Sequence, residues 1–146
     1  MFEKLFRRIK SVDIDRLIFD IAEYKRTADY EAFYTLIGGR VFFLRVDPAS
    51  TKGIPQGVHY RIQSADSVRL TGLANIQGLT LLPLFTSSDD KRLQDSHAEI
   101  EGLEALRMAL KTTGIDGVLF QNKEQSWVAL KLDQVQHVLA LHEDQP

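Results

Sequence analysis

The chain has 146 residues, the length of one domain, and 44% of them are hydrophobic, which is enough to build a buried core. It contains no cysteine, which excludes disulfide frameworks, thiolate metal sites and cysteine nucleophiles. Eighteen basic and twenty acidic side chains give a net charge of −2, without the basic excess typical of nucleic-acid binding, and we predict no nucleic-acid partner.

Residues 1–12 are predicted to form a basic amphipathic segment. Its apolar stripe repeats at helical spacing and consists of Phe2, Leu5, Phe6 and Ile9. Its opposite face is basic and carries Lys4, Arg7, Arg8 and Lys10. Three interpretations stay open: the segment docks on its own domain or on a second copy, on a partner protein, or on an anionic membrane surface. No apolar run reaches the about 18 residues of a membrane span, and there is no signal-peptide core, so we expect a cytoplasmic protein.

Two helices and a strand are predicted to follow. Asp13 can cap the first helix, which places an apolar stripe toward the core. The stripe consists of Ile14, Leu17, Ile18 and Ile21. A second helical pattern begins at Thr27 and ends at Gly38 and Gly39. Residues 40–46 are β-branched and aromatic and predict a strand.

Residues 47–57 contain two prolines and two glycines and predict a loop. It is longer than the usual about 4 to 6 residues, and long loops often carry function. Residues 59–63 and 67–71 each alternate with period two, so we predict that they pair as a hairpin.

Residues 78–85 form an apolar run typical of a buried strand, in which Pro83 indicates a position near the sheet edge or the strand end. The polar run 86–90 predicts that a helix begins there. A second capping pattern at residues 96–99 predicts a helix over residues 97–112, ended by Gly114. Its predicted core stripe consists of Ile100, Leu103, Leu106 and Leu110.

Residues 117–121 and 126–131 predict two strands joined by a polar turn. Asp133 is expected to cap a closing helix, followed by a frayed tail over residues 142–146. That helix is expected to bury Val135, Val138 and Leu139. The predicted architecture is one α+β domain over residues 1–146, with a mainly antiparallel sheet of five or six strands and packed helices.

Three stretches carry a family resemblance: Tyr30–Ile37 before a strand, the strand and turn Gly78–Ser87, and the strand, turn, strand and helix of residues 115–141. They resemble the bacterial SseB-like family, named for enhanced serine sensitivity. In its last turn that family often has Asn-Pro, whereas Lys123 follows Asn122 here, so nothing is carried over at this turn. The resemblance implies a small bacterial α+β domain with no catalytic residues to transfer. The secretion label sometimes attached to the family has no support in this sequence.

No motif for catalysis, cofactor binding or metal binding is present, so we predict no catalytic residue, no cofactor and no metal site. The four histidines do not form a zinc-binding HExxH pattern; they are His59, His97, His137 and His142. His97 and Glu99 have the spacing of half a zinc deaminase motif, but we interpret them as a solvent-facing histidine beside a capping glutamate. Tyr60, Phe42 and Trp127 are either core residues or a stacking surface, and core is the commoner arrangement.

These observations favour a non-enzymatic protein-interaction or adaptor domain. Regulatory binding of a small ligand is the alternative, and a small hydrolase is a weaker one. The expected partner is another protein, and a homodimer can form if the basic face of residues 1–10 meets the acidic segment 89–104 of a second copy. The candidate interaction surface consists of Asp47, Lys52, Gln56, Asp89, Asp90, Glu101 and Glu104.

Overall fold

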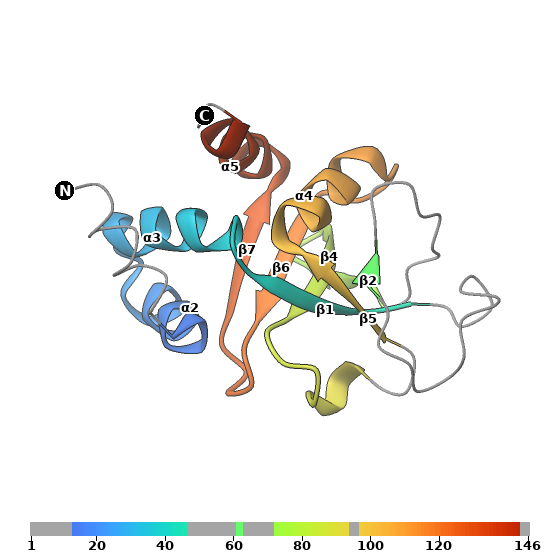
Figure 1. Cartoon of the computed structure of the whole chain (residues 1–146), viewed down its shortest axis with the longest axis horizontal. Coiled ribbons are helices and arrows are strands. Elements are labelled where there is room, and N and C mark those ends of the chain that lie inside the picture. Colours follow the sequence, from blue (N-terminus) through green and yellow to red (C-terminus); the bar gives the residue numbers. More distant parts are fainter. Residues whose placement is uncertain (1–12, 47–60, 63–71, 94–96, 144–146) are drawn as a thin grey trace.

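A computed structural model of the chain describes residues 13–46, 61–62, 72–93 and 97–143 (Figure 1). The predicted basic segment 1–12, the loop 47–57 and the second strand of the predicted hairpin, 67–71, lie outside these residues. The described helices are α2 (Ile14–Tyr24), α3 (Thr27–Ile37), η2 (Lys91–Leu93, a 3-10 turn), α4 (Gly102–Lys111) and α5 (Leu132–Glu143). The described strands are β1 (Val41–Arg45), β2 (Arg61–Ile62), β3 (Ala74–Ile76), β4 (Leu79–Phe85), β5 (His97–Glu101), β6 (Gly117–Gln121) and β7 (Trp127–Lys131).

Six of these strands follow one another across the sheet in the order β2, β5, β1, β4, β6, β7. The pairs β1 with β4, β1 with β5 and β6 with β7 are antiparallel, while β2 with β5 and β4 with β6 are parallel. The short β3 pairs with the first half of β4 in an antiparallel hairpin and adds a seventh strand. The predicted α+β class and the mainly antiparallel sheet are confirmed. The pattern did not reveal β3.

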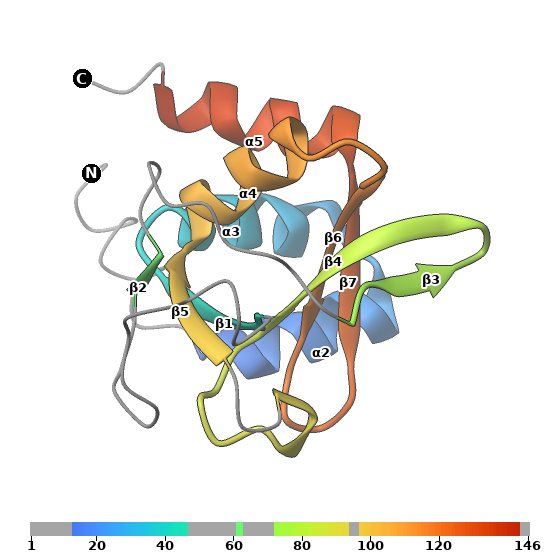
Figure 2. The same cartoon turned by 90° about the vertical axis from the view of Figure 1, so that its right-hand side faces the viewer.

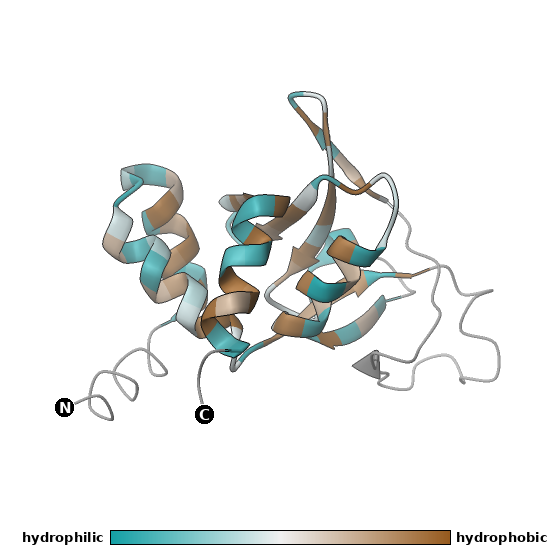
Figure 3. Cartoon of the chain, turned by 90° about the horizontal axis from the view of Figure 1, so that it is seen from above, coloured by the Kyte–Doolittle hydropathy of each residue, from teal (hydrophilic) through white to brown (hydrophobic). Residues whose placement is uncertain are grey.

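The helices pack against one face of the sheet, and Figures 1 and 2 show α3, α4 and α5 gathered beside the strands. Because strand side chains alternate between faces, the even-numbered residues of β4, β6 and β7 share the helix-covered face. Leu82, Leu84, Phe120 and Leu130 belong to the same buried cluster as the apolar residues of all four α-helices. In Figure 3 the helices accordingly show both apolar and hydrophilic sides. Four other buried hydrophobic residues lie outside this cluster: Leu81, Phe85, Leu93 and Leu119.

Pro83 lies in a central strand, and not at an edge or strand end as predicted, because β4 has β1 and β6 as neighbours. The backbone amide of Thr80 donates a hydrogen bond to the carboxylate of Asp116, and that of Thr86 donates to the carbonyl of Gln121. The backbone amides of the even-numbered residues of β4 therefore point toward β6. The nitrogen of Pro83 therefore points to the other side, where β3 pairs only with residues 79–81 and β1 only with residue 85. A residue without an N–H is tolerated in this gap.

The segment between β4 and α4 differs from the prediction. Among the described residues between the turn at 86–90 and β5, the three of η2 are the helical ones. Residues 97–101 form β5 and not the first turns of a helix, because all five pair with β1. The helix begins at Gly102, whose amide donates to the carbonyl of Arg40 at 2.9 Å and whose Cα lies so close to Ile37 that a Cβ would come within 2.3 Å of its carbonyl oxygen. Leu106 is buried as predicted, but Leu110 is 36% exposed, because α4 turns Ala105 and Ala109 inward instead.

The two terminal helical regions follow the prediction more closely. Asp13 caps α2 by accepting a hydrogen bond from the amide of Asp15 at 3.0 Å, and α3 begins at Thr27. The closing helix begins one residue before Asp133. It continues through Glu143, and a ring nitrogen of His142 lies 2.9 Å from the carbonyl oxygen of Tyr34. Residues 142 and 143 are therefore helical and do not belong to the predicted frayed tail.

Candidate functional site

A buried asparagine organises the end of the sheet where β4, β6 and β7 meet the start of α2. Asn122 is fully buried, and its Oδ1 accepts hydrogen bonds from the amides of Glu124 and Ser126 at 3.0 and 2.9 Å. Its Nδ2 donates to the carbonyl of Asp15 in α2 at 2.9 Å. The side chain therefore satisfies two amides of the β6–β7 turn and one carbonyl of a helix 107 residues away in sequence.

Arg92 of η2 is fixed to the same place. Its Nε and Nη2 donate to the two carboxylate oxygens of Asp90 at 3.0 and 2.7 Å, and its Nη1 donates to Oε1 of Gln121 at 3.0 Å. A further bond joins Nη2 to the carbonyl of Asn122 at 2.6 Å. The guanidinium also lies over the ring of Phe85, 5.0 Å from its centroid. We call Asp90, Arg92, Gln121 and Asn122 the Arg92 clamp, because they tie η2 to the end of β6.

The clamp changes the acidity of its carboxylate. The hydrogen bonds from the Arg92 side chain lower the pKa of Asp90, although its burial acts in the opposite direction. The neighbouring Asp89 is exposed, and its pKa is also lowered, first by the hydroxyl of Ser87 and then by Lys123. Both aspartates are therefore ionised and matched by a cation at neutral pH.

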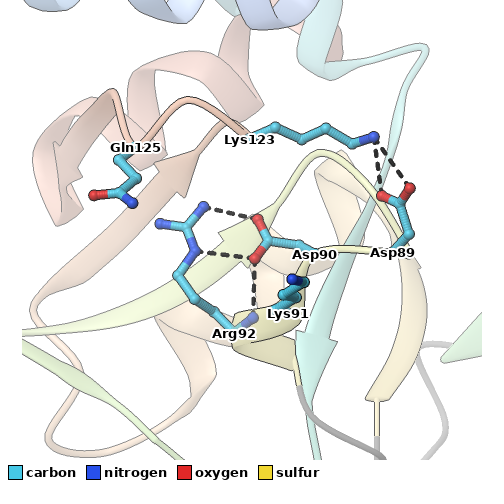
Figure 4. A pocket seen from close by; sticks show the side chains of 6 residues that line it. All are labelled: Asp89, Asp90, Lys91, Arg92, Lys123 and Gln125. Carbon is cyan, nitrogen blue, oxygen red and sulfur yellow. Dashed lines mark hydrogen bonds and ion pairs between the residues drawn. The ribbon is translucent and has the colours of Figure 1, made fainter.

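A hollow of about 320 Å³ lies beside the clamp, between η2 and the β6–β7 turn (Figure 4). Its lining side chains are Asp89, Asp90, Lys91, Arg92, Lys123 and Gln125. In Figure 4 Lys123 reaches across to Asp89, with its Nζ 3.0 Å from Oδ1, while Arg92 and Asp90 face one another. Since each acid already faces a cation, the hollow is close to neutral and mixed in charge, which suits a polar contact rim better than an anion site.

Trp127 adds an exposed aromatic ring to this region. It is directly opposite Gln121 in the β6–β7 ladder, so both side chains lie on the same face of the sheet. Gln121 is in turn bonded to Arg92. The indole is 45% exposed, whereas Phe42 is fully buried, so of the three aromatic residues singled out in the sequence only Phe42 is shown to be core; Tyr60 lies outside the described residues. We define the loop-end surface as Asp89, Lys91, Lys123, Gln125 and Trp127.

Of the seven residues predicted as one interaction surface, the four that the structure describes lie in two separate places. Asp47, Lys52 and Gln56 lie outside the described residues. Asp89 and Asp90 belong to the turn between β4 and η2, at the lower end of Figures 1 and 2, whereas Glu101 ends β5 and is followed directly by α4, which lies in the upper part of both views. Glu104 is on α4 and pairs with Arg107 at 2.5 Å. Asp89, Asp90 and Glu104 each face a cation, so their negative charges are partly balanced.

A second hollow, of about 750 Å³, lies between α3 and α5. It is lined by Thr27, Tyr30, Glu31, Tyr34, Thr35, Gln134, His137 and Leu141. The Tyr34 ring stands 6.2 Å from that of Tyr30 and 5.9 Å from that of His137, measured between ring centroids. The side-chain Nε2 of Gln134 donates a hydrogen bond to the Tyr34 hydroxyl at 3.4 Å. We call this hollow the α3–α5 groove. In the sequence, the sign of this groove is the spacing of Tyr30 and Tyr34, four residues apart on one helix.

The histidines lie in unlike surroundings. His97 is in β5, edge-on to Phe43 at 6.4 Å, and its Nδ1 is buried without a described hydrogen-bond partner. The interpretation of Glu99 as a helix-capping residue is wrong, since it lies in β5, where it is 5% exposed. Within the described ranges no cluster of three or more histidine, aspartate or glutamate side chains could hold a metal ion. None of the helices in these ranges is long and apolar enough to cross a membrane.

Comparisons with family models, curated proteins and solved structures found no match to this chain.

Proposed function

We propose that this chain acts by binding another protein, without catalysing a reaction, and that the loop-end surface is the docking face. One observation carries the proposal: Trp127 is 45% exposed beside a loop that the Arg92 clamp holds in place. Tryptophan, with tyrosine and arginine, is enriched among the residues that dominate binding energy at protein interfaces. An exposed tryptophan at a fixed position is therefore a candidate anchor.

The clamp supports this proposal because it reduces the conformational entropy that the surface loses when a partner binds. Four hydrogen bonds hold the Arg92 guanidinium, and Asn122 holds the turn from which Trp127 follows. A surface that is ordered before binding loses less conformational freedom when a partner docks. The exposed pair of Asp89 and Lys123 fits the polar rim that surrounds an interface core.

The remaining parts of the proposal rest on the sequence. The resemblance to the SseB-like family supports a bacterial origin for this domain, and a cytoplasmic location agrees with a chain that lacks cysteine. The partner is a different protein or a second copy of the chain. The loop over residues 47–57 extends the docking face if it lies beside the loop-end surface.

A specific observation also favours the alternative, which is regulatory binding of a small ligand. The α3–α5 groove has a volume of about 750 Å³ and places two tyrosine rings beside polar groups, as small-molecule sites do. A metabolite that raised the melting temperature of the intact chain would support this alternative.

The experiment compares capture of proteins from an extract of the native cell by the intact chain, by Trp127→Ala and by Leu73→Ala. Leu73 is a matched control, because its side chain is 43% exposed and it lies before β3 and not on the loop-end surface. We expect Trp127→Ala to weaken the affinity for captured proteins by about tenfold or more, as for an interface anchor, and Leu73→Ala to leave it unchanged. Equal capture by all three proteins would contradict the proposal.

A further inference from the structure

The α3–α5 groove is built to receive an apolar surface. Its walls are the half-buried rings of Tyr30 and Tyr34 on α3 and the exposed side chains of His137 and Leu141 on α5. The side chain of Leu141 is 43% exposed and adds apolar surface to the groove. The bond between Gln134 and the Tyr34 hydroxyl and the contact between His142 and the Tyr34 carbonyl fix α3 relative to α5. The groove is thus held open by contacts between its own walls.

The surroundings of the groove are acidic. Glu31 is its single charged lining residue among those described, since His137 is counted as neutral. The pair α2 and α3, residues 13–37, has six acidic and three basic side chains, a net charge of −3. Helix α5 has two acidic side chains and no lysine or arginine, a net charge of −2. An amphipathic segment with one apolar face and one basic face matches both the lining of the groove and the negative charge of the helices around it.

We infer that residues 1–12 of the same chain dock in the α3–α5 groove. Their sequence has the required pattern, because the stripe of Phe2, Leu5, Phe6 and Ile9 can face the tyrosines and Leu141. The four basic residues on the other side and Glu3 give residues 1–10 a net charge of +3, opposite to that of the helices. This is a second surface, separate from the loop-end surface, and it leaves Trp127 free for a partner.

The chain can reach the groove. Helices α2 and α3 are joined by the two residues Lys25 and Arg26 and run in opposite directions, so Asp13 lies at the same end of the pair as Ile37 (Figure 2). Packed helix axes are about 8–10 Å apart, and the three residues 10–12 can span about 10 Å. As a helix, Phe2 to Ile9 is about 10 Å long, which matches the about 12 Å between Thr27 and Thr35 along α3.

The test uses disulfide formation in the full chain, which has no natural cysteine to interfere. Leu141→Cys is combined with one cysteine at a time at positions 2, 5, 6 and 9. The matched control combines the same positions with Leu73→Cys, because Leu73 and Leu141 are both 43% exposed and Leu73 lies outside the groove. Mild oxidation is carried out at low protein concentration, and mass analysis separates crosslinks within a chain from crosslinks between chains.

We expect at least one stripe position to form a disulfide with Cys at position 141 within one chain, about tenfold or more faster than any position does with Cys at 73. Glu31→Lys should slow this crosslink by about two- to fivefold, as for an exposed charge pair, whereas Glu23→Lys, an equal change of charge on α2 outside the groove, should slow it less, because exposed charges are screened with distance. Equal rates for the two cysteine positions would overturn the inference. Crosslinks only between chains would overturn it in favour of a second copy as the occupant.

Discussion

At the scale of single residues, the amide of Asn122 and the guanidinium of Arg92 decide the local geometry of the loop-end surface. The side-chain amide of Asn122 both accepts and donates hydrogen bonds, and the guanidinium of Arg92 donates four hydrogen bonds to three different residues. Neither residue stood out in the sequence, because a hydrogen bond between residues 29 to 107 positions apart leaves no local pattern. The sequence directed attention to Asp89 and Asp90 instead, which are the partners of the cations.

The burial of Asn122 leads to a stability prediction. Asn122→Ala removes three side-chain hydrogen bonds and leaves the amides of Glu124 and Ser126 without their acceptor. We expect the free energy of unfolding to fall by about 2 to 4 kcal/mol. Glu124→Ala is the control, because this side chain is exposed in the same turn, and we expect a change within about 0.5 kcal/mol. Denaturant titration measures both, and equal midpoints would mean that the asparagine bonds are not needed.

The clamp also predicts a pH dependence. The pKa of Asp90 is lowered in the folded protein, so its contribution to stability is complete above the unfolded value of about 3.9 and is lost as the pH falls through the folded value. Asp90→Asn should therefore lower the free energy of unfolding by about 1 to 3 kcal/mol at pH 7, and by less and less below about pH 4.

The control for this prediction removes the cation. In an Arg92→Gln background the carboxylate has lost its main partner, so Asp90→Asn should have a smaller effect at pH 7, and that effect should vary less with pH. An Asp90→Asn effect of the same size at pH 3 and pH 7 would show that the ion pair does not stabilise the fold.

At the scale of elements, the largest difference between prediction and structure is the stretch of residues 97–111. Capping residues and helical spacing predicted one helix, but five of these residues pair with β1. Propensity for a helix is worth a few tenths of a kcal/mol per residue, and a strand inside a buried sheet gains more from its ladder and from the burial of Ala98 and Ile100. Tertiary pairing therefore overrides the local signal, and α4 begins at Gly102, where only a glycine fits beside Ile37.

The shift in the face of α4 can be tested with two identical substitutions on one helix. Leu106 is fully buried and Leu110 is 36% exposed. Leu106→Ala should lower the free energy of unfolding by about 2 to 5 kcal/mol, because it leaves a cavity in the core. Leu110→Ala should lower the free energy of unfolding by less than about 1 kcal/mol, although the sequence pattern predicted that both leucines face the core. If thermal unfolding showed equal losses for the two variants, the orientation of α4 would be wrong.

At the scale of the whole molecule, the four described α-helices cover one face of the sheet, and this arrangement separates the two candidate surfaces. Trp127 shares the opposite face with Gln121 and Arg92, whereas the α3–α5 groove lies within the helical layer. A partner at the loop-end surface and the N-terminal segment in the groove can therefore be present together. Substitutions at the two surfaces have no shared contacts, so their effects on binding and on the crosslink should be independent.

By itself, the sequence determined most of what depends on neighbouring residues. The periodicity of apolar side chains predicted α2, α3 and α5 and the strands β1, β4, β6 and β7, and the alternation in the strands without regular βαβ spacing led to the α+β class. Tertiary structure alone decided which strands pair and in which direction, where Pro83 sits, and whether residues 97–101 are strand or helix. It also brought Asn122 to Asp15 and Arg92 to Gln121. The physical reason is that periodicity records which face of an element avoids water, whereas strand pairing and buried hydrogen bonds depend on partners that only the folded chain brings within reach.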